Sequence, residues 1–296
     1  MGARNLLIGQ AAKARSVIPK SWDVPPRADG VYAPGGGPVQ RWQRDMTVDL
    51  HLMVFGDSTA TGYGCRIAEE VPGVLIARGL AEQSGKRVRL STKAIVGATS
   101  KGLSGQVDAM FVTGPPPDAA VILVGANDVT ALNGIGASAR RLGAAVRRLC
   151  ASGAVVVVAT CPDFGVVRAI PQPLRWTVRT LGLRLARAQS GAVRAAGGVP
   201  VPLASLVNDE FRHSPHLMLS EDQFHPSAAG YALAASQLLP ALCNALGEFN
   251  DEQTPALPSS TDTEAGPGYP VRRLFSRLWR RPTTGVPAPI VVATPG

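Results

Sequence analysis

Residues 48–64, VDLHLMVFGDSTATGYG, consist of a mostly apolar run of strand length followed by a turn of small and polar residues. The apolar run predicts a buried strand, and GDSTATG at 56–62 predicts the turn into a following helix. In open α/β sheets, ligands bind in the crevice outside the carboxyl ends of the strands. Ser58 therefore lies where a functional residue is expected, although serine in such a turn can also serve only to cap the next helix.

Strand-like and helix-like segments then alternate along the chain. Further strands are expected at 86–95, 119–124, 154–159 and 199–203. Helices are expected at 67–84, 102–111, 136–152, 174–196 and 226–246, the last beginning at Pro226. Continuously apolar strands are typical of a sheet covered on both faces, whereas the proline-containing segment 199–203 is expected at a sheet edge. The pattern predicts a doubly wound, mostly parallel five-stranded α/β sheet, with residues 208–223 polar and irregular.

The termini differ in composition from this alternating region, so three parts are predicted. Residues 1–47 form an N-terminal arm that begins with a short amphipathic helix and continues into proline- and glycine-rich sequence. The arm either folds back on the core or forms part of a site wall, and the sequence leaves both open. The catalytic domain spans 48–247, and 248–296 is a Pro-, Ser- and Thr-rich tail with the composition of a disordered linker.

One segment of the tail, 271–281, is basic and amphipathic. Its arginines can lie opposite a face of leucine and aromatic residues; they are Arg272, Arg273, Arg277, Arg280 and Arg281. Such a segment fits weak contact with an anionic membrane or a partner groove, and a basic tail without function is the alternative. The expected location is cytoplasmic with this peripheral membrane contact, because the sequence has no signal peptide and no apolar run long enough to span a bilayer.

Bulk composition excludes several classes of function. The formal net charge is +9, and residues 138–200 contain ten arginines against one acid, Asp163. No aromatic interleaving or nucleic-acid motif accompanies these arginines, so a solvated helix face is favoured over nucleic-acid binding. The four cysteines are far apart in the sequence, which indicates free thiols rather than a zinc site or a disulfide framework. No cofactor or metal is expected.

Downstream residues supply the partners that a catalytic Ser58 would need. A serine hydroxyl requires a general base, for which His225 is the leading candidate, with His213 and His216 in reserve. Asp222, three residues before His225, can orient its imidazole ring. An acyl-transfer site also needs donors for the developing oxyanion, and the backbone N–H groups of Ser58 and Gly97 and the amide of Asn127 are available. Asp57 and Asp128 are interpreted as buried carboxylates that organise loops, and His51 as structural.

These pieces resemble the SGNH, or GDSL, hydrolase family. The motifs that carry the resemblance occur in the family's order: GDSxxxG at 56–62, a glycine at 97, GxND at 125–128 and DxxH at 222–225. The Ala- and Arg-rich composition is similar to that of actinobacterial members. The resemblance implies a flavodoxin-like three-layer α/β/α sandwich and ester hydrolysis through an acyl-serine. It also implies Ser58 as nucleophile, His225 as base, Asp222 as its orienting acid, and Gly97 and Asn127 as oxyanion donors.

Other functions are weighed against this one. Within the same fold, a carbohydrate O-deacetylase or a thioesterase would use the same residues. The general α/β-hydrolase elbow GxSxG does not fit, because position 60 is alanine. A non-catalytic anion- or nucleotide-binding module could use 56–61 as a phosphate-cradling turn, but it would leave Asp222 and His225 unused. A catalytically dead scaffold is disfavoured because every catalytic position is filled. The sequence therefore predicts a serine-dependent carboxylic ester hydrolase acting on a small-molecule ester with a small to medium acyl group.

Overall fold

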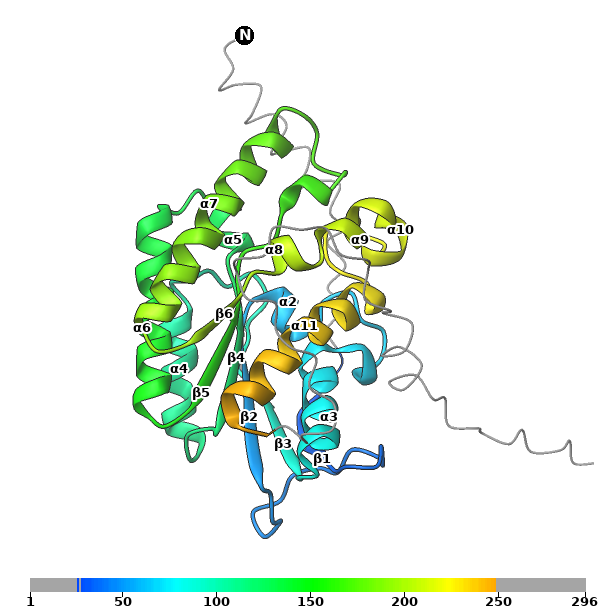
Figure 1. Ribbon diagram of the computed structural model, residues 1–296, viewed down its shortest axis with the longest axis vertical. Coiled ribbons are helices and arrows are strands. Elements are labelled where there is room, and N and C mark those ends of the chain that lie inside the picture. Colours follow the sequence, from blue (N-terminus) through cyan, green and yellow to red (C-terminus); the bar gives the residue numbers. More distant parts are fainter. Residues whose placement is uncertain (1–25, 27, 249–296) are drawn as a thin grey trace, which may run out of the picture. The chain divides into compact units, whose positions relative to one another are not determined.

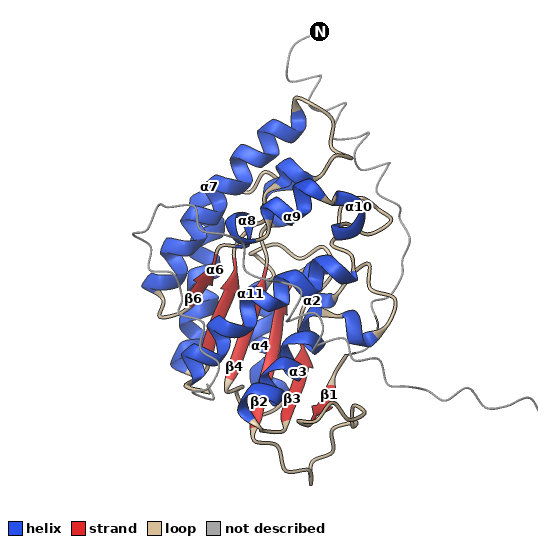
Figure 2. Cartoon of the chain, turned by 45° about the vertical axis from the view of Figure 1, so that its right-hand side comes forward, coloured by secondary structure: helices blue, strands red, loops and turns tan. Residues whose placement is uncertain are grey.

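The computed structural model describes residue 26 and residues 28–248. The sheet consists of β1 (Gly30–Tyr32), β2 (Leu50–Gly56), β3 (Val88–Thr92), β4 (Ala119–Leu123), β5 (Val155–Ala159) and β6 (Val199–Val201). Its strand order is β1-β3-β2-β4-β5-β6, with β1 antiparallel to β3 and the other neighbours parallel. Figure 2 shows β1 and β6 at the two edges.

Helices follow the strands. The α-helices are α2 (Ser58–Thr61), α3 (Pro72–Ser84), α4 (Leu103–Thr113), α5 (Ala126–Thr130), α6 (Ile135–Ala151), α7 (Leu174–Ala195), α8 (Leu203–Leu206), α9 (Asn208–His213), α10 (Pro215–Met218) and α11 (Ala228–Leu246). Two 3₁₀ turns, η1 (Ala68–Glu70) and η2 (Phe164–Val166), lie between them. Residues 208–223 are thus more regular than predicted, because α9 and α10 are helices of one to two turns, too short to produce a clear apolar period.

The sheet is buried on both faces. Side chains alternate along β2, so Leu52 and Val54 belong to the core that includes α3 and α11, whereas Met53 and Phe55 belong to the core that includes α4 and α6. Figure 1 shows α3 and α11 on one side of the sheet and α4, α6 and α7 on the other. The three-layer α/β/α sandwich is therefore confirmed.

The predicted count of five strands is wrong, because the sheet has a sixth strand, β1, within the predicted arm. β1 pairs Gly30 with Leu90 and Tyr32 with Val88. A strand of three residues is too short to show a period, so the sequence pattern does not reveal it. Of the two alternatives left open for the arm, residues 28–40 fold back on the core, because β1 pairs with β3 and Gln40 in turn bridges to Val31 of β1.

The last helix begins later than predicted. Pro226 bridges to Leu219 instead of starting the helix, and Ser227 caps α11 by accepting a hydrogen bond from the Gly230 N–H at 3.2 Å. The predicted amphipathic helix of the arm and the basic segment 271–281 lie outside the described residues. The three-part domain division stays a prediction. In the part of the chain that the structure describes, no helix has the length and apolar character required to cross a membrane.

Candidate active site

The turn after β2 is held in place by a glycine and a glutamine. Gly56 has φ +136°, and a Cβ atom added there would lie 1.9 Å from the Leu123 carbonyl oxygen, so only glycine fits. Gln106 of α4 accepts from the Gly56 N–H and donates to the Gly56 carbonyl, both at 2.8 Å. These contacts fix the carboxyl end of β2 against β4 and α4.

Asp57, rather than Ser58, caps the helix that follows. Its Oδ1 accepts from the Thr59 N–H at 2.9 Å and from the Thr59 hydroxyl at 2.7 Å. Burial raises the pKa of Asp57, and the two hydrogen bonds from Thr59 oppose that rise. The carboxylate organises the loop, as expected from the sequence, and the Ser58 hydroxyl is left for another partner.

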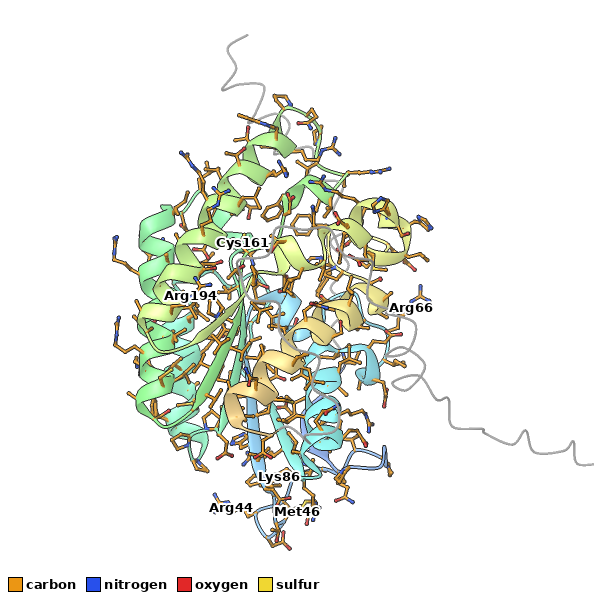
Figure 3. The ribbon with its side chains drawn as sticks, viewed as in Figure 1. Arg44, Met46, Arg66, Lys86, Cys161 and Arg194 are labelled. Carbon is orange, nitrogen blue, oxygen red and sulfur yellow. The ribbon has the colours of Figure 1, made fainter. Side chains whose placement is uncertain are left out.

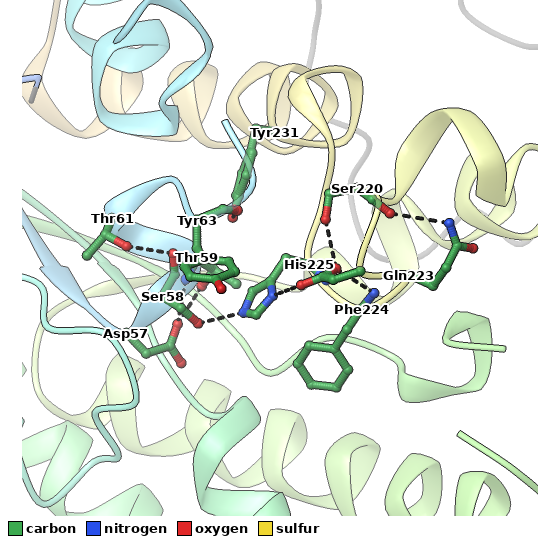
Figure 4. Close-up of polar contacts among 11 residues, drawn as sticks. Asp57, Ser58, Thr59, Thr61, Tyr63, Ser220, Gln223, Phe224, His225 and Tyr231 are labelled. Atoms are coloured by element: carbon green, nitrogen blue, oxygen red, sulfur yellow. Dashed lines mark hydrogen bonds and ion pairs between the residues drawn. The ribbon is translucent and has the colours of Figure 1, made fainter. Parts of the chain in front are cut away.

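That partner is His225, which lies 167 positions away in sequence. Ser58 Oγ is 2.9 Å from His225 Nε2, and His225 Nδ1 is 2.6 Å from Asp222 Oδ2 (Figure 4). The structure thus joins the three residues predicted as nucleophile, base and orienting acid by two consecutive hydrogen bonds.

The loop that carries the acid and the base is closed on itself. Asp222 Oδ1 accepts from the Ser220 hydroxyl at 2.7 Å and from the Phe224 and His225 N–H groups at 2.9 and 2.8 Å. Gln223, at the tip, has φ +56°, and the Ser220 N–H donates to the His225 carbonyl. Burial alone would raise the pKa of Asp222, but hydrogen bonds from His225 and Ser220 outweigh it and lower the pKa to about 2. Asp222 is therefore ionised throughout the neutral range.

Aromatic rings hold the imidazole from two directions. The ring centroids of Tyr63 and Phe224 lie 4.5 and 5.1 Å from that of His225. The Tyr231 hydroxyl, buried on α11, donates to the Tyr63 carbonyl at 2.8 Å. These supporting residues were not predicted from the sequence, because an isolated aromatic residue has no distinctive spacing.

Of the predicted oxyanion donors Asn127 and Gly97, only Asn127 lines the cavity beside Ser58. Asn127, in the first turn of α5, lines the same cavity as Ser58, and its Nδ2 donates to the Ala98 carbonyl at 3.0 Å. Gly97 lies in the loop after β3, next to Ala98; it is exposed, has φ +79° and is not among the residues lining the cavity. The oxyanion role of both residues stays a prediction.

Asp128 fixes these loops, as expected. Its carboxylate accepts from the Ser100 N–H at 2.8 Å and from the hydroxyls of Ser100 and Ser138, each at 2.7 Å. It also accepts from the Asn133 amide at 3.0 Å. The loop after β3 is thereby tied to α5 and α6.

A second buried glutamine joins the ends of β4 and β5. Gln189 donates to the Val124 carbonyl at 3.0 Å and accepts from the Cys161 N–H at 2.7 Å. Gln189 and Gln106 were missed, although a signal exists: Gln189 is four residues from both Leu185 and Val193, so it interrupts the apolar face of its helix. Buried polar side chains of this kind complete the hydrogen bonds of strand ends.

The cavity beside Ser58 has a volume of about 120 Å³ and a mainly apolar lining. The apolar wall includes Leu123, Ala159, Leu203, Val207, Phe211, Leu219 and Ala234. The reserve bases His213 and His216 do not line it. All four cysteines are free, as predicted, and Cys161 lies in the interior at the end of β5 (Figure 3). Within residues 28–248, no cluster of three or more His, Cys, Asp or Glu side chains is arranged to hold a metal ion.

Comparisons with known proteins give a consistent result. The model of the "GDSL-like Lipase/Acylhydrolase family" matches residues 54–233. A GDSL-like esterase of Mycobacterium tuberculosis is 67% identical over 291 residues, which cover 97% of this chain and 92% of the relative. The crystal structure of a lipase/acylhydrolase from Enterococcus faecalis is similar in fold, with a TM-score of 0.54, 22% identity, and coverage of 70% of this chain and 100% of that chain. A psychrotrophic esterase from Pseudoalteromonas sp. matches with a TM-score of 0.52, 20% identity, and coverage of 67% and 100%.

Proposed function

The chain belongs to the GDSL-like lipase/acylhydrolase family, and from that premise we propose that it hydrolyses esters of short carboxylic acids through an acyl intermediate on Ser58. The observation that supports this most directly is the continuous chain of hydrogen bonds from Ser58 Oγ through His225 to Asp222. It supplies a nucleophile and a base that both line one cavity, and a carboxylate that orients the base.

The acylation step follows from this geometry. As Ser58 Oγ attacks the ester carbonyl carbon, His225 Nε2 takes the hydroxyl proton, and the Asp222 carboxylate stabilises the resulting imidazolium. The oxyanion that forms is stabilised by N–H donors, for which we propose the Ser58 and Gly97 backbone and the Asn127 amide. The carbon–oxygen bond to the alcohol then breaks, and His225 returns the proton to the departing oxygen.

Deacylation repeats these steps with water in place of the serine. His225 takes a proton from a water molecule, the hydroxide oxygen attacks the acyl carbonyl, and the bond to Ser58 breaks. His225 returns the proton to Ser58 Oγ, and the carboxylic acid leaves. Each turnover thus consumes one ester and one water molecule and releases the alcohol and the carboxylic acid.

The cavity size supports short acyl groups. An apolar cavity of about 150 Å³ holds the six carbons of a benzene molecule. The cavity of about 120 Å³ beside Ser58 therefore fits an acyl chain of up to roughly five carbons. A chromogenic ester series of increasing acyl length measures this directly. We expect kcat/KM to fall beyond about five carbons, and a preference for long chains would contradict this substrate range.

Replacement of Ser58 by alanine tests the mechanism. The hydroxyl of Ser104 on α4 is exposed, so Ser104→Ala is a matched control that should keep wild-type turnover. Loss of the nucleophile of a Ser-His-Asp triad reduces kcat about 10⁶-fold, so we expect a loss of this order in Ser58→Ala. Unchanged turnover in Ser58→Ala would sink the mechanism. Selective activity on thioesters or acetylated sugars would instead favour a thioesterase or an O-deacetylase working with the same residues.

The tail proposal rests on sequence alone. We propose a cytoplasmic protein that contacts anionic membranes weakly through five arginines of 271–281: Arg272, Arg273, Arg277, Arg280 and Arg281. Removal of 269–296 should reduce sedimentation with anionic liposomes and leave sedimentation with neutral liposomes unchanged. Equal binding by the full chain and the truncated chain would refute the membrane role.

A further inference from the structure

A second cleft, distinct from the cavity beside Ser58, lies between η2, the beginning of α7 and α9. Its volume is about 510 Å³, within the range of small-molecule sites. Four arginines and one tryptophan contribute to its lining: Arg168, Arg175, Trp176, Arg179 and Arg212. We call it the arginine cleft.

The arginine cleft carries an excess of positive charge. The carboxylate that pairs with its arginines is Asp163: Arg179 Nε lies 3.1 Å from each of its oxygens, and Arg212 Nη2 lies 3.4 Å from Oδ2. The guanidinium groups of Arg168 and Arg175 make no ion pair or hydrogen bond with residues 28–248, and Arg175 donates only through its backbone N–H, to the Pro171 carbonyl. Four guanidinium groups against one carboxylate leave three positive charges uncompensated.

This arrangement differs from an ordinary solvated helix face. The arginines come from the loop after η2, from α7 and from α9, and they converge on one concave surface. By contrast, Arg184 and Arg187 lie farther along α7, are exposed and line no part of the cleft. Trp176, with 63% of its surface exposed, adds an aromatic face. Convergent guanidinium groups match the geometry of phosphate oxygens.

The arginine cleft adjoins the catalytic cavity. Val166 lines both, and Asp163, which binds Arg179 and Arg212, lines the catalytic cavity. The segment that carries Asp163 and Val166 also contacts the neighbours of His225. The ring centroid of Phe164 is 6.3 Å from that of Phe224, and the Phe224 ring in turn contacts His225. Since the apolar cavity suits the acyl group, the alcohol part of an ester must extend away from it.

We propose that the arginine cleft binds a phosphate group on the alcohol or thiol part of the substrate. The inference rests on the proposed function and adds a substrate class to it: short-chain acyl esters or thioesters whose leaving group is phosphorylated. The cleft raises affinity for these substrates and takes no part in bond breaking. Neutral esters are hydrolysed with the same kcat but without this gain in affinity.

Two pairs of substrates test the proposal, and the members of each pair differ only by a phosphate-bearing group. The phosphate lies close to the acyl group in the first pair and far from it in the second. The first pair is 1-butyrylglycerol and its 3-phosphate; the second is butyryl-pantetheine and butyryl-coenzyme A. In at least one pair, we expect the phosphorylated member to have a KM about 10-fold lower at low salt. The difference should shrink at 1 M salt, where charges are screened over about 3 Å.

The double variant Arg168→Gln/Arg175→Gln should abolish that preference. Its kcat/KM on p-nitrophenyl butyrate should stay at the wild-type value, which also reports correct folding. Arg184→Gln/Arg187→Gln removes the same amount of charge from the part of α7 outside the cleft, and it should keep the preference. Equal KM values within both pairs, or equal losses in the two double variants, would overturn the cleft assignment while leaving ester hydrolysis intact.

Two further outcomes separate the remaining explanations. Inorganic phosphate should inhibit hydrolysis of the phosphorylated substrate competitively and leave p-nitrophenyl butyrate hydrolysis unchanged. If inorganic phosphate alters turnover of the neutral ester, the cleft binds a free effector anion and the substrate assignment is wrong. If the wild type hydrolyses no ester or thioester at all, both the proposed function and the cleft assignment fail.

Discussion

Asp222→Asn changes one atom of the candidate triad and tests how the loop controls the imidazole. Asp222 Oδ1 accepts from three donors, the Ser220 hydroxyl and the N–H groups of Phe224 and His225. In the asparagine variant, these donors require the amide oxygen at the Oδ1 position, so the NH₂ group must face His225 Nδ1. Nδ1 can then only accept, and the ring proton moves to Nε2, the nitrogen that faces Ser58. The base at the serine is lost.

We expect Asp222→Asn to cause a large loss of kcat and a modest loss of folding stability. A wrong imidazole tautomer lowers kcat about 10⁴-fold, which corresponds to about 5 kcal/mol of transition-state free energy. The pKa of Asp222 is lowered to about 2. Such a carboxylate stabilises the folded state above its unfolded pKa, and this contribution disappears as pH falls through the folded value. At pH 7, the variant lacks this contribution, so its free energy of unfolding should fall by about 2 kcal/mol.

The assay is p-nitrophenyl butyrate hydrolysis, with thermal unfolding measured on the same samples. Glu221→Gln is the matched control, because the Glu221 side chain is 86% exposed and adjoins Asp222 in sequence; it should retain wild-type kcat. A folded Asp222→Asn protein with kcat within 10-fold of the wild type would refute the tautomer argument.

Three further perturbations address the scaffold. Gly56→Ala places a Cβ atom 1.9 Å from the Leu123 carbonyl oxygen, so we expect loss of soluble folded protein, measured by expression yield and circular dichroism; a stable variant would contradict the close approach. Gln106→Leu leaves the Gly56 N–H and carbonyl without their side-chain partner and should lower the free energy of unfolding in urea by about 2–4 kcal/mol. Burial, with the charge of Arg89, lowers the pKa of His51 to about 4, so the unfolded chain binds the extra proton between about pH 6.5 and 4. Stability should therefore fall by up to about 3 kcal/mol as pH decreases through that window, and His51→Gln should flatten the decrease in a pH series of urea titrations.

The main strands could be predicted because each carries its signal locally. β4 and β5 are continuously apolar, and β2 runs into a turn of small residues, so each segment identifies itself without reference to its neighbours. β1 could not be predicted, since Gly30–Tyr32 becomes a strand only by pairing with β3. The start of α11 was misplaced for a similar reason: Pro226 has the local preference for a first turn, but its bridge to Leu219 places the cap at Ser227.

The candidate triad could be predicted only as a set of motifs. Asp222 and His225 are close in sequence, and the three-residue spacing indicates their pairing. Nothing local links them to Ser58, whose distance of 2.9 Å from His225 is set by the whole sheet and α11. The positions of the arginines of 138–200 in space could likewise not be predicted from the sequence. They were interpreted as a solvated face, and only the fold separates Arg168 and Arg175, which line a cleft, from Arg184 and Arg187, which do not.

By itself, the sequence determined the three-layer fold, the family and the residues of the candidate triad, because these depend on apolar runs, turn residues and motifs that each span only a few positions. The tertiary structure decided which residue caps α2, which buried glutamines complete the strand ends, and which arginines converge beside the catalytic cavity. Those outcomes depend on contacts between segments far apart in the chain, whose geometry is fixed only when both faces of the sheet are packed. The turn at 56–62, taken alone, is compatible with Ser58 as a helix cap or as a nucleophile, and the downstream motifs favoured the nucleophile; the structure gives the cap to Asp57 and places the Ser58 hydroxyl against His225.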